Sequence, residues 1–258
     1  MKNVALITGA SKGIGREFAL LHAARGGDLV ILARGEDELR QLKKEIQKRH
    51  ERKVRVLVKD LTAEQAPQEV FDWCEAEGIQ VKILINNAGF GGHGLFYERE
   101  WATDRNMIQL NIIALTALTR LFLPGMVARK KGRILNVSST ASLVPGPLQA
   151  VYFATKAYVT SFSNAIAEEL RDTGVTVTAL LPGATDTHFA NVAGMEDAEL
   201  FKNAVSARSV AKDGYDAMRA GELEVISGLS FSQKILMRAA PLTPKKIILK
   251  QIRQMQEK

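Results

Sequence analysis

The sequence has 258 residues, 46% of them apolar, and its 35 Lys and Arg outnumber its 28 Asp and Glu, which gives a formal net charge of +7. This composition is ordinary for a globular protein and excludes an intrinsically disordered chain. Because Cys74 is the single cysteine, an intrachain disulfide is excluded as well.

Domains usually hold about 100 to 200 residues, and no linker favours a division of this chain, so we expect one domain over residues 1–258. A core strand begins within the first eight residues, and a cleavable signal peptide is therefore not expected. No uninterrupted apolar run approaches the ~20 residues of a bilayer span, which predicts that no transmembrane segment is present. Together with the cysteine usage, these features predict a cytoplasmic protein.

Short apolar runs alternate with amphipathic segments along the whole chain. The runs are typical of strands and cover residues 4–8, 28–33, 54–59, 82–86, 132–138, 175–181 and 222–227. The clearest helical segments cover residues 39–50, 63–77, 106–130 and 152–171. Most strands are apolar on both faces, which indicates a parallel sheet covered by helices on both sides. The predicted fold class is α/β, a single doubly wound Rossmann-type domain with about seven parallel strands.

One helix start carries a signal of its own. Thr62 is followed three residues later by Gln65, the pattern of a capping box, which predicts a helix that begins directly after Thr62. In a doubly wound fold, ligands lie beyond the carboxyl ends of the strands. Candidate site residues are therefore expected in the segments that follow the strands.

A glycine-rich loop, TGASKGIG, connects the first strand to an amphipathic helix. Gly9, Gly13 and Gly15 allow a tight turn, so that backbone N–H groups approach a pyrophosphate at the positive end of the helix. The spacing differs from the GxGxxG fingerprint, and glycines also serve tight turns without a ligand. The position between a strand and a helix favours a bound dinucleotide.

The end of the second strand bears on the choice of cofactor, because Ala33 is followed there by Arg34. An acidic residue at this position would bind the ribose hydroxyls of NAD and repel a 2′-phosphate. A guanidinium instead holds a phosphate through two hydrogen bonds, and Lys12 in the glycine loop offers a second cation. We predict NADP(H) rather than NAD(H); the alternative is that both cations are solvated surface groups.

The segment YFATK places Tyr152 and Lys156 four residues apart and so on one face of a helix. A free tyrosine has a pKa of about 10 and is a poor base at neutral pH, whereas a neighbouring ammonium lowers that pKa. We expect Lys156 to lower the pKa of Tyr152 in this way. Ser138 and Ser139 after the fifth strand, and Asn111 in a helix, would each be ordinary residues if they stood alone.

Taken together, TGASKGIG, Asp60, NNAG at 86–89, Asn111, Ser139, YFATK and PGATDT at 182–187 resemble the short-chain dehydrogenase/reductase family over essentially the whole chain. The VILAR end of the second strand and the segment LVPGPLQAVYFATKAYVTSFSNA are most similar to NADP-preferring reductases of the hydroxysteroid and long-chain ketoacyl type. The resemblance implies NADP(H)-dependent hydride transfer between nicotinamide and a carbonyl or secondary alcohol of a small molecule.

The resemblance also implies roles for single residues. Tyr152 would protonate the carbonyl oxygen. Lys156 would lower the pKa of Tyr152 and bind the nicotinamide ribose. Ser139 would hydrogen-bond the substrate oxygen, and the adjacent Ser138 is the alternative. Asn111 would support a water that links Lys156 to solvent. The residues expected to bind the cofactor are Gly9, Ser11, Lys12, Gly13, Ile14, Gly15, Arg34, Asp60, Leu61, Asn87, Ala88, Gly89, Tyr152, Lys156, Pro182, Gly183, Thr185 and Thr187.

Two further segments bear on the substrate. Residues 188–206, with apolar side chains but no firm period, and the glycine-rich loop 90–94 indicate either a lid over an apolar carbonyl substrate or packing on the domain. His93 and His188 have no carboxylate or thiol partner at metal spacing, so no metal site is expected. The C-terminal extension, 228–258, mixes apolar and basic residues and would form a substrate entrance, a subunit contact or a weak membrane-surface anchor.

Several other functions compete with this interpretation. A nucleotide-sensing module without chemistry would lack part of the set Tyr152, Lys156 and Ser139, and a 3-oxoacyl-(acyl-carrier-protein) reductase is the alternative enzyme because surface cations would suit an acidic carrier. The basic stretch 43–55 invites a nucleic-acid function, but glutamates interrupt it and favour a solvated helix face, so no nucleic-acid partner is expected. The family resemblance of the helices at 106–130 and after Tyr152 implies a homodimer or homotetramer.

Overall fold

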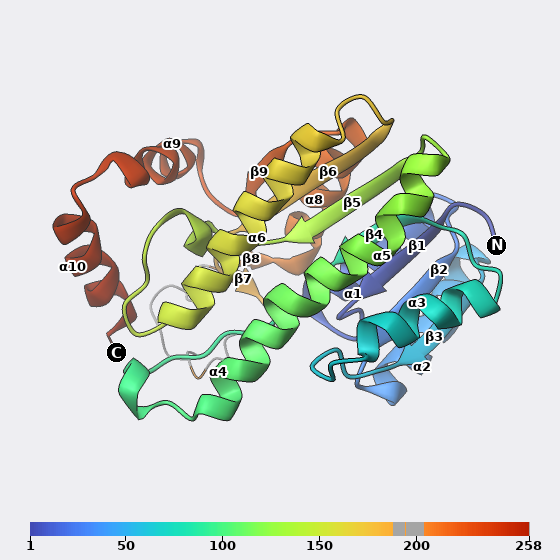
Figure 1. Cartoon of the computed structure of the whole chain (residues 1–258), viewed down its shortest axis with the longest axis horizontal. Coiled ribbons are helices and arrows are strands. Elements are labelled where there is room, and N and C mark those ends of the chain that lie inside the picture. The colour runs from blue at the N-terminus through green and yellow to red at the C-terminus, as the bar shows by residue number, and fades with distance from the viewer. Residues whose placement is uncertain (188–193, 195–203, 258) are drawn as a thin grey trace.

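The computed structural model describes residues 1–187, 194 and 204–257. Within these ranges, parallel strands form a seven-stranded sheet in the order β3-β2-β1-β4-β5-β6-β9 (Figure 1). The strands are β1 (Val4–Thr8), β2 (Leu29–Ala33), β3 (Val54–Val58), β4 (Val81–Asn86), β5 (Gly132–Val137), β6 (Val175–Pro182) and β9 (Glu224–Ser227). A second ladder pairs β7 (Thr185–Asp186) with β8 (Val205–Ser206). The direction of strand addition reverses between β1 and β4, and this switch point is where such folds bind ligands.

Helices cover both faces of the sheet, with α3, α5 and α6 in front of it and α1, α2 and α8 behind it in the view of Figure 1. The first group consists of α3 (Ala66–Ala76), α5 (Leu115–Ala128) and α6 (Ala150–Glu169), and the second of α1 (Gly13–Ala24), α2 (Glu36–His50) and α8 (Ala207–Ala220). The predicted doubly wound fold is confirmed.

Two core clusters, one on each face of the sheet, explain why the strands are apolar throughout. Along β1, Ala5 and Ile7 pack in the cluster under α1, α2 and α8, whereas Val4 and Leu6 pack in the cluster under α3, α5 and α6. Successive strand residues point to opposite faces, so a strand covered on both sides has no face that is open to water and is mostly apolar throughout. Complete burial of one such aliphatic side chain contributes about 1.5 to 3 kcal/mol.

The predicted capping box at Thr62 is wrong. Helix α3 begins only at Ala66, and Gln65 precedes it without a side-chain cap. The Thr62 hydroxyl donates a hydrogen bond of 2.8 Å to the Asp60 carboxylate, which also accepts one of 2.9 Å from the Thr62 backbone N–H. The Thr62 hydroxyl is thus directed to the Asp60 carboxylate, a charged acceptor two residues away, and not to a helix N-terminus. Pro67 in the first turn of α3 favours the later start of the helix.

The long helix predicted over residues 106–130 begins earlier and contains an irregular turn. It runs from α4 (Trp101–Ile108) through a π-helical turn, η2 (Gln109–Ala114), into α5. By length and composition alone, the stretch Trp101–Ala128 is apolar enough to cross a membrane, and its most apolar window of 18 residues has a mean hydropathy of 1.6. This is weak evidence for a span, because core helices pass the same test and Leu118, Phe122 and Met126 are buried against the sheet.

A buried histidine joins α1 to α8 behind the sheet. The Nε2 atom of His22 lies 2.8 Å from the carbonyl oxygen of Asn3, and Nδ1 lies 2.7 Å from the hydroxyl of Tyr215. A neutral ring satisfies both contacts, with Nε2 as the donor and Nδ1 as the acceptor of the tyrosine proton. Burial lowers the pKa of His22 below its usual value, because desolvation penalises the imidazolium.

His22 should therefore make the fold sensitive to acid. The unfolded chain takes up the proton at a pKa of about 6.5, while the folded chain resists it, so the free energy of unfolding should fall by up to about 1.4 kcal/mol per pH unit below that value. Urea denaturation at several pH values measures this slope. His22→Gln should remove it, and His50→Gln, at the end of α2, should keep it. An unchanged slope in His22→Gln would contradict the assignment.

Candidate active site

The glycine loop after β1 follows a path that only glycine permits at two positions. Gly9 has a φ of +66°, and a β-carbon there would lie 2.8 Å from Asn87 Nδ2. A β-carbon on Gly15 would overlap the carbonyl oxygen of Gly9. The backbone thus stays close to β4 and turns sharply into α1, as a loop that surrounds a phosphate must.

Asn87 holds this loop in place from the neighbouring strand. Its Nδ2 donates to the carbonyl oxygens of Thr8, at 2.9 Å, and of Gly9, at 3.2 Å. The backbone N–H groups of Asn87 and Ala88 both donate to Thr8 Oγ1, at 3.0 and 2.9 Å. The NNAG segment therefore fastens the end of β4 to the end of β1 at the switch point.

The N-terminus of α1 is open to an anion. The helix begins at Gly13, Lys12 precedes it without a side-chain cap, and the first turn carries no acidic residue. Thr187 lies over the loop, because a β-carbon on Gly13 would be 3.0 Å from its Cγ2. Uncapped N–H groups beside a glycine cradle fit the pyrophosphate of a dinucleotide. Of the other predicted contacts here, Ile14 packs on the core and Ser11 is half-buried.

Arg34 and Lys12 each stand beside a carboxylate. Arg34 is 77% exposed, with Nη1 3.9 Å from Asp60 Oδ2, and Lys12 Nζ lies 3.1 Å from Glu38 Oε1. Although burial opposes ionisation of Asp60, hydrogen bonds from Thr62 and the charge of Arg34 hold its pKa below the usual value. Sequence reasoning missed Glu38. Leu61, which was predicted to bind the cofactor, has its side chain in the core.

The serine that faces the tyrosine is Ser139. Its side chain hydrogen-bonds Tyr152, and its Oγ also accepts from the backbone N–H of Ala141 at 3.1 Å. Ser138 is turned away, with its Oγ 2.9 Å from the carbonyl oxygen of Lys156 and 2.7 Å from Thr160 Oγ1. The two adjacent serines therefore have separate tasks: Ser139 lies at the tyrosine hydroxyl, and Ser138 fastens α6 to β5.

Tyr152 and Lys156 are buried on α6, 8% and 6% exposed. The Lys156 ammonium donates a hydrogen bond of 2.9 Å to the carbonyl oxygen of Val137 and lies 5.8 Å from the centre of the tyrosine ring. Burial lowers the pKa of Lys156 to about 8. Burial also raises the pKa of Tyr152 to about 12, against the opposing effect of the hydrogen bond with Ser139.

In this structure burial sets the direction of the Tyr152 pKa, because desolvation disfavours the phenolate more than the hydrogen bond with Ser139 favours it. The expected effect of Lys156 on this pKa stays a prediction. The phenol stays protonated at neutral pH. This state suits a group that donates a proton.

Asn111 lies in the π-helical turn η2, which brings it to the site. Its Nδ2 donates to the carbonyl oxygen of Phe90 and to Thr155 Oγ1, both at 3.0 Å, and its Oδ1 accepts from the N–H of Phe90 at 3.2 Å. A β-carbon on Gly89 would lie 3.0 Å from Asn111 Oδ1 and 3.5 Å from Lys156 Nζ, so the two side chains meet at this glycine. Such turns are frequent at functional sites. Thr155 was missed, although it directly precedes Lys156 in YFATK.

The segment after β6 closes the site from the side of the sheet. The carbonyl oxygen of Pro182 accepts from Ser139 Oγ at 3.4 Å, and the N–H of Gly183 donates to the carbonyl oxygen of Ser227 at 2.9 Å. Thr185 Oγ1 donates to the carbonyl oxygen of Gly183 at 3.0 Å. The predicted contact residues of PGATDT are thus gathered at the carboxyl ends of β5, β6 and β9.

The predicted lid lies mostly outside the described residues, which leave out 188–193 and 195–203 and with them His188. Its last residues, Val205–Ser206, form β8. In the part of the chain that the structure describes, no three His, Cys, Asp or Glu side chains gather as a metal ion would require.

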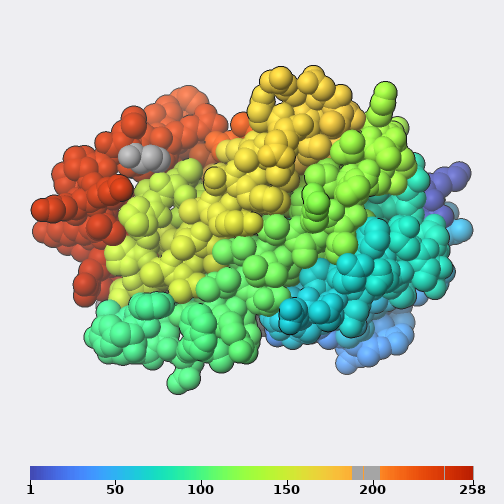
Figure 2. Space-filling view, in the orientation of Figure 1, coloured from blue at the N-terminus to red at the C-terminus, as the bar shows by residue number. Residues whose placement is uncertain are grey.

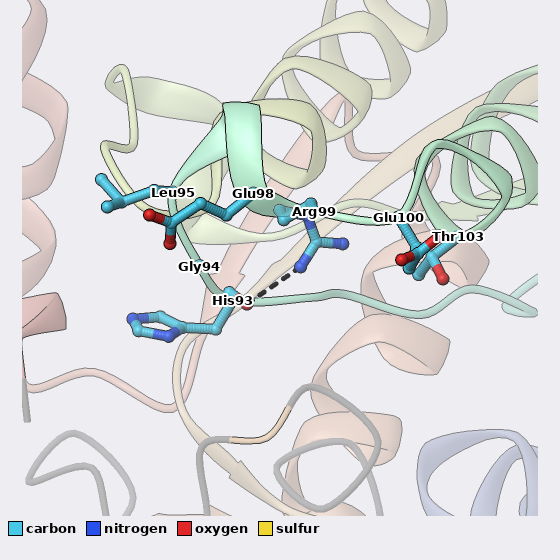
Figure 3. A pocket seen from close by; sticks show the side chains of 7 residues that line it. All are labelled: His93, Gly94, Leu95, Glu98, Arg99, Glu100 and Thr103. Atoms are coloured by element: carbon cyan, nitrogen blue, oxygen red, sulfur yellow. Dashed lines mark hydrogen bonds between the residues drawn. The ribbon is translucent and has the colours of Figure 1, made fainter.

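A hollow of about 340 Å³ lies beside the loop 90–94 (Figure 3). Arg99 points into it and fixes the loop, because its Nη1 donates to the carbonyl oxygen of His93 at 3.0 Å and its guanidinium binds the buried Asp104. The ring of His93 in turn contacts the carbonyl oxygen of Gln256 at 2.8 Å. This link from the site to the C-terminal helix spans 163 residues of sequence and carries no local signal.

Comparison with known proteins places the chain in a family. A family model described as short chain dehydrogenase matches residues 3–197, and the chain belongs to this family. The very-long-chain 3-oxoacyl-CoA reductase of Bos taurus is 34% identical over 194 residues, which are 73% of this chain and 61% of the relative. The 17-beta-hydroxysteroid dehydrogenase type 3 of Mus musculus is 35% identical over 71% of this chain and 60% of its own length. The resemblance to hydroxysteroid and ketoacyl enzymes is confirmed, and the chain spans about three fifths of these relatives.

Solved structures agree with this assignment. A short-chain dehydrogenase from Sphingobium yanoikuyae in complex with NADPH superposes with a TM-score of 0.85 at 31% identity, over 93% of both chains. A bulky-bulky ketone specific alcohol dehydrogenase from Comamonas testosteroni superposes with a TM-score of 0.80 at 28% identity, over 93% of this chain and 92% of its own.

Replacement of the two serines should separate chemistry from stability. Ser139→Ala should lower kcat by about 10²- to 10³-fold, because one hydrogen bond to the developing oxyanion is lost. Ser138→Ala should instead lower the free energy of unfolding by about 1 to 3 kcal/mol while kcat changes little, since its buried partners lose a hydrogen bond. Steady-state kinetics and urea denaturation measure the two effects. A larger loss of kcat in Ser138→Ala would reverse the assignment.

Proposed function

We propose that the protein is an NADP(H)-dependent oxidoreductase that transfers hydride between nicotinamide and the carbonyl or secondary alcohol of a bulky apolar molecule. The observation that carries this proposal is the buried Tyr152, hydrogen-bonded to Ser139 with Lys156 one turn along α6. This group lies at the same edge of the sheet as the glycine loop.

Reduction of a carbonyl places negative charge on its oxygen, and the protein offers two groups that take it up. Tyr152 donates the proton, and Ser139 supplies a second hydrogen bond. Loss of the proton leaves a phenolate, which the Lys156 ammonium stabilises in a site with little water to screen the two charges. A bound nicotinamide dinucleotide supplies the hydride in this direction and accepts it in the reverse one.

The protonation states fit proton donation to a carbonyl oxygen. Tyr152, with its pKa raised to about 12, holds its proton at neutral pH, and Lys156, with its pKa lowered to about 8, is still mostly charged there. The acid and its stabilising cation are thus both ready before a carbonyl binds. Alcohol oxidation would instead need the phenolate, which burial disfavours.

The cofactor proposal rests on charge. Arg34 and Lys12 lie where a 2′-phosphate would be bound, and the strand before them ends in Ala33 rather than in an acidic residue. The relative from Sphingobium yanoikuyae was solved with NADPH. A phosphate would compete with Glu38 and Asp60 for the two cations.

The substrate proposal rests on the surroundings of Tyr152. Its ring lies in a third core cluster with Met107, Val144, Phe153 and Ala240, against which Phe90 and Leu143 also pack. The relatives are named for 3-oxoacyl-CoA, 17-beta-hydroxysteroids and bulky ketones, all of which pair a carbonyl or hydroxyl group with a large apolar body. A ketone on such a body is the substrate class proposed here.

We also propose that the protein works as a homo-oligomer in the cytoplasm. The stretch Trp101–Ala128 is strongly apolar, yet only 39% of its most apolar window is buried, and Ile113 is 47% exposed. Tyr158 on the neighbouring α6 is 37% exposed and hydrogen-bonds Thr116 across the two helices. Figure 2 shows this pair of helices, in green and yellow, across the front of the molecule. Pairing with a second copy would cover this surface.

A substrate screen tests the activity. Wild-type protein should oxidise NADPH with bulky ketones, and with 3-oxoacyl thioesters of coenzyme A rather than of acyl carrier protein. Arg34→Ala combined with Lys12→Ala should lower kcat/KM for NADPH about tenfold, because charge-assisted hydrogen bonds to the phosphate are lost. Arg40→Ala, on the surface of α2, is the matched control. Equal values of kcat/KM for NADPH and NADH in the wild type would contradict the cofactor assignment.

A second comparison distinguishes an enzyme from a sensor. Tyr152→Phe should abolish turnover and still bind NADPH, as measured by the fluorescence of the nucleotide. Wild-type protein that binds NADPH but reduces none of these carbonyls would support the sensing module instead.

Light scattering tests the oligomer. The wild type should have the mass of a dimer or tetramer, and Ile113→Glu with Tyr158→Glu should lower it by placing like charges in the contact. Phe96→Glu, at a distant exposed position, is the control. A monomeric wild type would disprove the proposal.

A further inference from the structure

The C-terminal arm, Phe231–Gln256, projects from the left end of the molecule in Figures 1 and 2. It consists of α9 (Phe231–Ala239), the short turn η5 (Ala240–Leu242) and α10 (Lys245–Gln256). Helix α9 buries none of its residues, and Phe231, Leu236 and Ile235 are 80%, 69% and 55% exposed. Large exposed apolar side chains on a helix without a fully buried residue indicate a partner surface.

Helix α10 holds the arm to the body of the protein by one side only. Ile248 and Ile252 pack on the cluster that contains Tyr152, and the carbonyl oxygen of Gln256 contacts the ring of His93. Other apolar side chains of this helix remain exposed, among them Ile247 at 51% and Met255 at 55%. The arm is therefore fixed in place while much of its apolar surface faces outward.

The charge of the arm is strongly one-sided. Residues 228–258, which contain the arm and its flanking residues, hold seven Lys or Arg and one Glu, a net +6 against the +7 of the whole chain. Arg253 pairs with that residue, Glu257, at 2.7 Å. The other cations of the arm form no ion pair with any residue that the structure describes; they are Lys234, Arg238, Lys245, Lys246 and Lys250.

The exposed apolar side chains and the unpaired cations together indicate which kind of partner the arm binds. A second copy docked through the same face would bring two sets of unpaired cations together, because a two-fold contact joins a patch to itself. An anionic lipid surface attracts the cations through its headgroups and accepts the apolar side chains between them. We propose that the C-terminal arm docks this protein peripherally on an anionic membrane surface.

The position of the arm also connects membrane docking to catalysis, a step that rests on the proposed function. Ile248 and Ile252 line the back of the cluster around Tyr152, so a membrane in contact with α9 and α10 lies next to the reaction site. An apolar ketone dissolved in the bilayer would then reach the site without crossing bulk water. Membrane binding itself needs no turnover and can be measured separately.

Vesicle sedimentation of the full-length protein tests the proposal. The protein should bind vesicles of equal parts phosphatidylcholine and phosphatidylglycerol, bind phosphatidylcholine vesicles weakly, and dissociate as sodium chloride is added. Binding that is absent, or equal for both vesicles, would overturn the proposal. This comparison uses the wild type alone and so does not depend on the folding of any variant.

Charge-neutralising variants locate the surface. Each cation near an anionic membrane raises the binding constant about fivefold, so Lys245→Gln, Lys246→Gln and Lys250→Gln together should weaken binding about 100-fold. The matched control is Lys43→Gln, Lys44→Gln and Lys48→Gln, which removes the same charge from α2. Equal losses in the two triple variants would show a general effect of net charge and would overturn the assignment to the arm.

The apolar residues distinguish a membrane from a second copy. Phe231→Ser with Leu236→Ser should lower vesicle binding about tenfold for each residue and leave the mass measured by light scattering unchanged. A variant of lower mass with unaltered vesicle binding would identify the arm as a subunit contact. Carbonyl reduction in detergent solution should continue in both arm variants, whereas failure of the proposed function would show as no activity in the wild type.

Discussion

The hydrogen bond from the Lys156 ammonium to the carbonyl oxygen of Val137 connects the chemistry to the fold. It fastens a buried charge of α6 to the last residue of β5, and Ser138 adds a second link between the same elements. Tyr152 and Ser139, which stand on these two elements, are held at one spacing as a result. Burial disfavours the charged form of both side chains, so it lowers the pKa of Lys156 and raises the pKa of Tyr152.

A second set of contacts places the nucleotide half of the site against this pair. Thr8 and Asn87 join β1 to β4 at the point where the strand order reverses, and the glycine loop starts from the same residues. The uncapped end of α1 and the acid-base pair thereby share one edge of the sheet. The contacts that join β1 to β4 and α6 to β5 are hydrogen bonds, so this geometry depends on hydrogen bonding and tight packing.

The fold could be predicted from the sequence because strands apolar on both faces have few alternatives to a covered parallel sheet. Several site segments could be located in the same way, because each lies at or just after the end of a strand; they are TGASKGIG, Asp60, NNAG, Ser139 and PGATDT. YFATK and Asn111 lie in helices and were found through the family resemblance. Two effects of the folded surroundings could not be predicted in this way: the Asp60 carboxylate accepts a hydrogen bond from the Thr62 hydroxyl, and burial raises the pKa of Tyr152. Contacts such as Gln149 with Gln256, 107 residues apart, depend on the folded structure and leave no pattern in the chain.

The π-helical turn at Gln109–Ala114 makes the length of this helix as consequential as its composition. Such a turn holds one residue more than a regular α-helical turn, so the helical segments on either side keep their faces while the wider turn takes up the extra residue. Deletion of one residue there would leave the stripe at Leu118 and Phe122 facing the sheet, but it would remove the wide turn that brings Asn111 to Phe90 and Thr155. The shortened helix would keep its packing and lose this polar contact, so engineering of the segment should conserve its residue count.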